Sequence, residues 1–122
     1  ADFIGDAVAL YGLDPARLTY LGYSNGANLL GAILRLHPGL IRRAILLRGI
    51  EVLENPPTPD LSGTRILLLS GAEDPYSHLA PALAASLKGA GADLDARVIS
   101  AGHGLSDLDR DNARDWSHGE TD

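Results

Sequence analysis

The sequence predicts an α/β domain with a mostly parallel sheet flanked by helices. Helical and strand-like periods alternate along the chain, the strand-like runs are almost entirely apolar, and Gly- or Pro-containing turns separate them. Strands that are apolar on both sides are typical of a parallel sheet that helices cover on both faces. A length of 122 residues with 45% hydrophobic content suits one core, so we expect a single domain over residues 1–122.

The first half of the chain predicts two helices and two strands. Asp2 to Tyr11 carries apolar residues at helical spacing and ends at a glycine. Leu18 to Tyr23 is short, apolar and aromatic, as expected for a buried strand. Asn25 to Leu36 is a helix rich in Ala and Leu that ends at a His-Pro-Gly turn, and Ala44 to Leu47 is a second strand.

The second half predicts two further strands, each followed by a helix. Arg65 to Leu69 is apolar after its first residue, and His78 to Lys88 is a helix ended by glycines. Leu94 to Ile99 includes charged residues, which favours a place near a sheet edge, and Ser106 to Trp116 is the last helix. The one long irregular stretch is Gly49 to Gly63; long loops in compact domains are often functional.

Composition excludes several classes of function. The net charge of −6 argues against nucleic acid, which needs clustered Lys and Arg. No apolar run approaches the roughly 18 residues of a membrane span, and no signal peptide is visible. The absence of cysteine removes disulfides, thiolate metal sites and Cys nucleophiles, and it fits the cytoplasmic location that we expect.

Gly22-Tyr23-Ser24-Asn25-Gly26 places a serine in a G-x-S-x-G pattern between a predicted strand and a predicted helix. Such a turn lifts the serine hydroxyl out of the sheet, at the positive end of the following helix. Ser24 is therefore a candidate nucleophile, and the backbone N–H of Asn25 is a candidate oxyanion donor. The alternative is a glycine-rich turn with an incidental serine.

His103 is the candidate base that would take the proton of a serine nucleophile. It lies between two glycines, after the last predicted strand and before the last helix. The carboxyl ends of parallel strands are where open α/β sheets place ligand chemistry. The alternative is a loop histidine without a role, which is the interpretation that we favour for His37, His78 and His118.

Asp74 is the candidate acid that would orient the histidine. It follows the 65–69 strand directly, so Ser24, Asp74 and His103 should share one edge of the sheet. Glu73 competes for this role one residue earlier. We favour Asp74 because Pro75 fixes the chain beyond it.

Three aspartates near the C-terminus, Asp107, Asp109 and Asp111, mimic the first half of a calcium-binding loop. Asn112 stands where that loop needs glycine, and the final bidentate Glu is missing. The aspartates are better interpreted as the solvated face and N-terminal charges of the last helix, where Ser106 with Asp109 resembles a capping box. The sequence implies no metal and no organic cofactor.

The order Ser, Asp, His along the chain is that of α/β-hydrolases, and three segments carry a closer resemblance. Tyr20–Asn28 (YLGYSNGAN), Leu67–Pro75 (LLLSGAEDP) and Ala101–Leu105 (AGHGL) resemble the phospholipase/carboxylesterase family of small α/β-hydrolases, in its bacterial carboxylesterase branch, related to acyl-protein thioesterases. Leu46-Leu47-Arg48 also matches that branch. The resemblance implies Ser24 as nucleophile, Asp74 as acid and His103 as base.

The sequence departs from that family at its N-terminal side. Family members begin with several strands and a loop with a His-Gly motif, whose backbone N–H completes the oxyanion hole. This sequence supplies neither. Ala1 to Gly12 matches the helix that precedes the strand leading to the serine. Because position 1 is also not Met, we expect the C-terminal part of a longer α/β-hydrolase fold that lacks the N-terminal strands. The 18–23 strand would then have one uncovered edge.

The sequence therefore predicts a serine hydrolase that cleaves carboxylic esters or thioesters through an acyl-enzyme. The expected partner is a small-molecule ester or thioester, with the 49–63 loop helping to form its pocket; a homodimer is left open. One alternative is a non-catalytic binding module on the same fold. Another is a receiver-like or flavodoxin-like domain, which would have an acidic cluster or a phosphate-binding loop at the position of Ser24.

Overall fold

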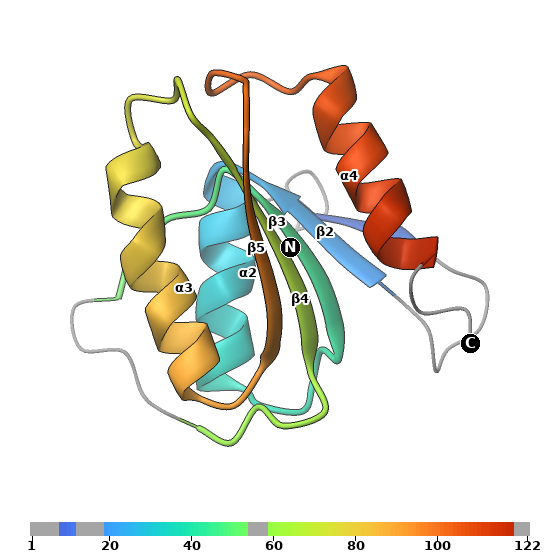
Figure 1. Ribbon diagram of the computed structural model, residues 1–122. Coiled ribbons are helices and arrows are strands. Elements are labelled where there is room, and N and C mark those ends of the chain that lie inside the picture. The colour runs from blue at the N-terminus through green and yellow to red at the C-terminus, as the bar shows by residue number, and fades with distance from the viewer. Residues whose placement is uncertain (1–7, 12–18, 54–58, 119–122) are drawn as a thin grey trace.

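The computed structural model describes residues 8–11, 19–53 and 59–118. Five strands lie side by side in the order of the sequence (Figure 1). Strands β2 to β5 are parallel, and β1 pairs with β2 in the antiparallel direction. Their bounds are β1 Val8–Tyr11, β2 Thr19–Tyr23, β3 Arg43–Leu47, β4 Arg65–Gly71 and β5 Asp93–Ile99.

Helices cover both faces of this sheet. Figure 1 shows α2 (Asn25–Leu36) and α3 (Ala80–Gly89) on one face and α4 (Asp107–His118) on the other. A short 3₁₀ turn, η2 (Ser77–Leu79), leads into α3. The loops after β4 and β5 lie together at the upper end of Figure 1, as expected when parallel strands bring their carboxyl ends to one edge.

The core alternates between the two faces along each central strand. In β4, Ile66 and Leu68 pack toward α2 and α3, whereas Leu67 and Leu69 belong to a second cluster with Trp116 of α4. Successive side chains of a strand point to opposite faces, and here both faces are covered. All four of these β4 residues are at most 1% exposed, which explains the continuous apolar run in the sequence.

The predicted strands and helices from residue 19 onward are confirmed within one or two residues at most ends, and β5 does lie at the edge of the sheet. The elements predicted at 25–36 and 44–47 correspond to α2 and β3. Leu18, the predicted start of the second element, lies outside the described residues. Residues 49–53 and 59–63 of the long irregular segment contain no helix or strand.

The expectation for residues 2–11 is wrong where the structure describes them. Val8–Tyr11 is a strand rather than part of a helix, and it pairs with the edge of β2 that we expected to be uncovered. Residues 2–7 lie outside the described part. An apolar segment this short does not distinguish a helical period from a strand period, so the sequence could not exclude a strand. The open edge of β2 offers N–H and C=O groups with which a neighbouring segment can pair.

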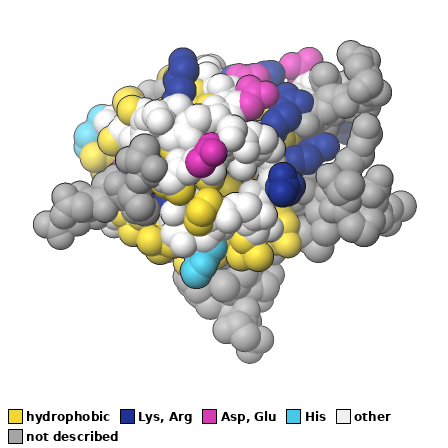
Figure 2. Space-filling model, turned by 90° about the horizontal axis from the view of Figure 1, so that it is seen from below, with side chains coloured by type: hydrophobic (Ala, Val, Ile, Leu, Met, Phe, Trp, Pro, Cys, Tyr) yellow, Lys and Arg dark blue, Asp and Glu magenta, His cyan; other side chains and the backbone are white. Residues whose placement is uncertain are grey.

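The amino ends of the strands, opposite the loops after β4 and β5, carry aromatic and basic side chains. The guanidinium carbons of Arg43 and Arg65 lie 5.4 and 5.2 Å from the centroid of the Trp116 ring. Figure 2, a view from below, shows Lys and Arg side chains gathered on one side of this end. None of the helices in the described ranges is long and apolar enough to cross a membrane.

Candidate active site

Ser24 lies in the tight turn between β2 and α2. Its backbone has φ 55° and ψ −114°, a left-handed conformation that a non-glycine residue rarely adopts. Its N–H donates to the carbonyl of Leu47 at 2.8 Å, which ties the turn to the end of β3. A Cβ on Gly22 would stand 2.6 Å from the carbonyl oxygen of Gly26, so the first glycine of the G-x-S-x-G pattern is required by the close approach of helix and strand.

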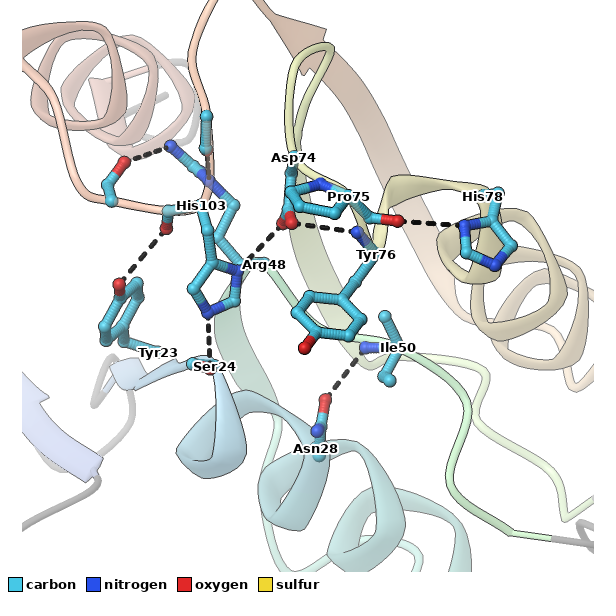
Figure 3. Close-up of polar contacts among 12 residues, drawn as sticks. Tyr23, Ser24, Asn28, Arg48, Ile50, Asp74, Pro75, Tyr76, His78 and His103 are labelled. Carbon is cyan, nitrogen blue, oxygen red and sulfur yellow. Dashed lines mark hydrogen bonds and ion pairs between the residues drawn. The ribbon is translucent and has the colours of Figure 1, made fainter.

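His103 lies between Ser24 and Asp74. Its Nε2 atom is 2.9 Å from the Ser24 hydroxyl oxygen, and its Nδ1 atom is 3.0 Å from a carboxylate oxygen of Asp74 (Figure 3). The three side chains follow β2, β4 and β5, at the carboxyl end of each strand. The structure thus brings together the three residues that the sequence singled out, although 79 positions separate Ser24 from His103.

The Asp74 carboxylate is buried, with the residue 5% exposed, and it accepts hydrogen bonds on both oxygens. One oxygen faces His103, and the other accepts the N–H of Tyr76 at 3.0 Å. The competing acid, Glu73, is exposed, and its N–H donates to the carbonyl of Ala101. The choice of Asp74 over Glu73 thus agrees with where the two side chains lie.

The surroundings of Asp74 favour its ionised form. Burial raises the pKa of this carboxyl group, but three effects outweigh burial: the Tyr76 N–H bond, the His103 bond, and the positive charges of protonated His103 and of Arg48. Together they hold the pKa of Asp74 below its ordinary value of 3.8. Asp74 is therefore a carboxylate at neutral pH, able to accept a proton-bearing Nδ1 of His103.

Two aromatic rings flank the imidazole of His103. The Tyr23 ring centroid lies 5.8 Å away and the Tyr76 centroid 5.7 Å away, the second in an edge-on arrangement. The Tyr23 hydroxyl donates to the backbone carbonyl of His103 at 3.1 Å. Figure 3 shows the two tyrosines on opposite sides of the histidine. The rings restrict the space around the imidazole and so limit its rotation.

The loops that carry Asp74 and His103 touch through backbone atoms. A Cβ on Gly71 would stand 2.4 Å from the carbonyl oxygen of Ala101, so only glycine fits at this crossing. The N–H of Ala72 also donates to the carbonyl of Ile99 at 2.8 Å. The spacing between acid and base is therefore set by main-chain contact as well as by their side chains.

Asn25 begins α2, directly after Ser24, and is exposed. The N–H groups in the first turn of a helix have no acceptor within the helix, so they are available to a negatively charged oxygen. The side chain of Asn28, one turn later, accepts the N–H of Ile50 at 2.8 Å. This bond ties the start of the 49–63 segment to α2 (Figure 3).

Sequence reasoning missed a buried ion pair behind the site, between Arg48 and Asp109. Both residues are buried, at 3% and 4% exposure, and their side chains form two parallel hydrogen bonds. Asp109 was expected on a solvated helix face, which is wrong. It does accept the N–H of Ser106 at 2.9 Å, which is the carboxylate half of a capping box. The available signal was an arginine directly after a fully apolar strand.

His37, His78 and His118 belong to other elements of the fold. His37 is exposed at the end of α2, and His78, in η2, hydrogen-bonds through Nδ1 to the carbonyl of Pro75. His118 ends α4. Among the described residues, no three His, Cys, Asp or Glu side chains are grouped to hold a metal ion.

Comparison with known proteins finds hydrolases and carboxylesterases. No family model matches the sequence. A putative hydrolase, MhqD, from Bacillus subtilis (strain 168) is 29% identical, over 94% of this chain and 58% of the relative. The crystal structure of a carboxylesterase from Mesorhizobium loti is 47% identical with a TM-score of 0.80, over 83% of this chain and 49% of that one. A Bacillus cereus carboxylesterase, 24% identical with a TM-score of 0.80 over 88% of this chain and 51% of its own, supports the fold alone.

The sheet topology and these likenesses define part of an α/β-hydrolase fold. The proteins that the chain resembles are carboxylesterases and a putative hydrolase. The chain spans about half the length of the relatives that it matches.

Proposed function

We propose that this protein is a serine hydrolase that cleaves carboxylic esters or thioesters through an acyl-enzyme, with Ser24 as nucleophile. One observation carries the proposal: a continuous hydrogen-bonded series runs from the Ser24 hydroxyl through His103 to the Asp74 carboxylate. A serine hydroxyl becomes a useful nucleophile when a base lies within hydrogen-bond reach and a third group orients that base.

In the proposed reaction, His103 Nε2 takes the hydroxyl proton while Ser24 Oγ attacks the carbonyl carbon of the substrate. The Asn25 N–H stabilises the oxyanion of the tetrahedral intermediate. The intermediate collapses when His103 returns the proton to the departing alcohol or thiol, which leaves an acyl-serine. A water molecule, deprotonated by the same histidine, then releases the carboxylic acid and restores Ser24.

Asp74 has a separate task in this scheme. Its ionised carboxylate accepts the Nδ1 proton of His103 and leaves Nε2 as the free acceptor that faces Ser24. It also stabilises the imidazolium that forms during the attack. The net lowering of the Asp74 pKa is consistent with this role, since a protonated Asp74 would lose the charge.

The relatives support an ester as the substrate class. The Mesorhizobium loti protein is described as a carboxylesterase and the Bacillus subtilis protein as a putative hydrolase. No metal or organic cofactor takes part in the proposed steps, which use the three side chains and one backbone N–H.

Covalent labelling by a fluorophosphonate tests this proposal in the full-length protein. An activated serine attacks phosphorus and expels fluoride, so mass spectrometry should find one adduct on Ser24. Ser24→Ala should remove the adduct, whereas Ser100→Ala, at an exposed serine after β5, should keep it. Absence of labelling at Ser24 in the folded protein would favour a non-catalytic binding module and overturn the proposal.

A further inference from the structure

The loop that carries His103 has little backbone support of its own. Among the described residues, residues 102–104 form no backbone–backbone hydrogen bond, and glycines stand on both sides of the histidine. Glycine is the residue with the greatest backbone freedom. Interactions from elsewhere must therefore hold this segment in the geometry that brings Nε2 to the Ser24 hydroxyl.

The side chains of Tyr23, at the end of β2, and Arg48, directly after β3, supply those interactions. The carbonyl oxygens of the three successive residues Gly102, His103 and Gly104 each accept a hydrogen bond. Tyr23 binds the central carbonyl, and Arg48 binds the two outer ones: its Nε donates to Gly102 at 2.8 Å and its Nη2 to Gly104 at 3.0 Å. One guanidinium thus holds the chain on both sides of the histidine.

Arg48 is itself firmly placed. It follows β3 with φ 60°, and its N–H donates to the carbonyl of Leu69 in β4 at 2.9 Å. The left-handed backbone is uncommon for arginine and persists where surrounding contacts fix it. Figure 3 shows Arg48 beside His103, between the sheet and the loop that carries the histidine.

Asp109 of α4 compensates the buried charge. Its two carboxylate oxygens accept hydrogen bonds from the two terminal nitrogens of Arg48, the longer of them 2.8 Å. Burial raises the pKa of Asp109, but the Arg48 and Ser106 hydrogen bonds and the charge of Arg48 lower it overall, so the group is ionised. The pair joins the last helix to the loop that precedes it.

We propose that Arg48 is a positioning residue for the base: it fixes the His103 loop through the carbonyls of Gly102 and Gly104, with Asp109 as its counter-ion. This inference rests on the proposed function, because it gives Arg48 its effect through His103. This positioning role also requires an arginine rather than a lysine. A planar fork with five donors can reach two carbonyls and a carboxylate at once, whereas a lysine ammonium offers three donors at a single point.

The molecule contains a matched control in Arg35 of α2. Arg35 is equally buried, at 1% exposure, and pairs with Glu51. Its remaining hydrogen bonds go to the carbonyl of Gly31 and the hydroxyl of Ser86, not to the His103 loop. Substitution of either arginine should therefore disturb one buried ion pair, but only one of them holds the histidine.

The experiment compares Arg48→Lys with Arg35→Lys in the full-length protein, well below the melting temperature, with rates expressed per folded molecule. Misplacement of a catalytic group by about 1 Å can lower a rate about 10²-fold. We expect kcat of Arg48→Lys to fall by about 10- to 100-fold with KM within about threefold, and kcat of Arg35→Lys to stay within about twofold. A kcat of Arg48→Lys within twofold of wild type, or an equal loss in Arg35→Lys, would overturn the inference.

A spectroscopic measurement keeps the inference testable if the variants lose stability. With ¹⁵N-labelled histidine, the Nδ1 proton shared by His103 and Asp74 should give a sharp downfield signal in wild type and in Arg35→Lys. Arg48→Lys should broaden or remove it, and its persistence there would contradict the inference. Ser24→Ala separates the two proposals: hydrolysis that survives in that variant rejects the proposed function, whereas a neutral Arg48→Lys beside an inactive Ser24→Ala rejects only the role of Arg48.

Discussion

The site at the carboxyl ends of the strands and the core beneath α2 and α3 are built from the same strands but held by different interactions. In β4, Ile66 and Leu68 are buried among apolar side chains, whereas Asp74, a few residues further on, is fixed by hydrogen bonds. The site also includes left-handed backbone at Ser24 and Arg48. Apolar burial stabilises the fold, and polar contacts and strained backbone arrange the chemistry.

The two regions therefore control different properties of the protein. Changes at the site should alter rate far more than stability, because the side chains concerned bury little apolar surface. Changes in the core should do the opposite, because the loss of buried methyl groups lowers stability while the site geometry is set by loops at one end.

Ser24→Ala should lower ester hydrolysis by about 10⁶-fold, because removal of a serine nucleophile eliminates covalent catalysis. The circular-dichroism spectrum and melting temperature should stay close to wild type, since Ser24 is only partly buried and α2 begins at the next residue. p-Nitrophenyl acetate turnover measures the rate, with Ser100→Ala as control. Retained activity in a normally folded Ser24→Ala protein would remove Ser24 from the mechanism.

Asp74→Asn should lower kcat by up to about 10⁴-fold, because an amide in this position can hold the imidazole in the wrong tautomer. The matched change next to it, Glu73→Gln, should leave kcat within a few-fold, since Glu73 is exposed and its side chain does not face His103. Steady-state kinetics on both variants gives the comparison. If the two effects were reversed, Glu73 rather than Asp74 would be the orienting acid.

Leu68→Ala should lower the free energy of unfolding by about 2–5 kcal/mol, the usual cost of a cavity at a fully buried leucine. Leu68 is 1% exposed, whereas Val98, on the edge strand β5, is 72% exposed. Val98→Ala is therefore the control, and its effect should stay within about 0.5 kcal/mol. Urea unfolding measures both, and kcat per folded molecule should not change. A large loss of kcat in folded Leu68→Ala would show that core and site are not separable.

The smallest expected effect is the pH dependence of the stability that Asp74 provides. Its folded-state pKa lies below the ordinary value of 3.8, so its contribution is fully present above about pH 5 and is lost as the pH falls through the lowered pKa. The stability difference between wild type and Asp74→Asn should therefore shrink between about pH 6.5 and pH 3. Urea unfolding at the two pH values tests this, and a difference that grew on acidification would contradict the sign.

Much of the fold could be predicted because its signals are local. The β4 run Ile66–Leu69 and the Ala- and Leu-rich α2 each carry their period in the sequence. The parallel arrangement then places residues that follow β2, β4 and β5 at one edge, which is why Ser24, Asp74 and His103 could be chosen together. β1 could not be predicted, since Val8–Tyr11 is too short to have a distinct period. It forms by pairing with the edge of β2, a tertiary contact that its own residues do not indicate.

From residue 19 onward, the order of elements, the G-x-S-x-G turn and the choice of three candidate residues could be predicted from the sequence, because each depends on residues close together in the chain. How the histidine loop is held depends on tertiary contacts. Arg48 and Asp109 are 61 positions apart, and the ion pair that joins them behind His103 exists only when α4 has packed against the sheet that contains β3. The apolar strand before Arg48 indicates a buried arginine, but no local pattern identifies its partner, because the charge of each residue is compensated only across the fold.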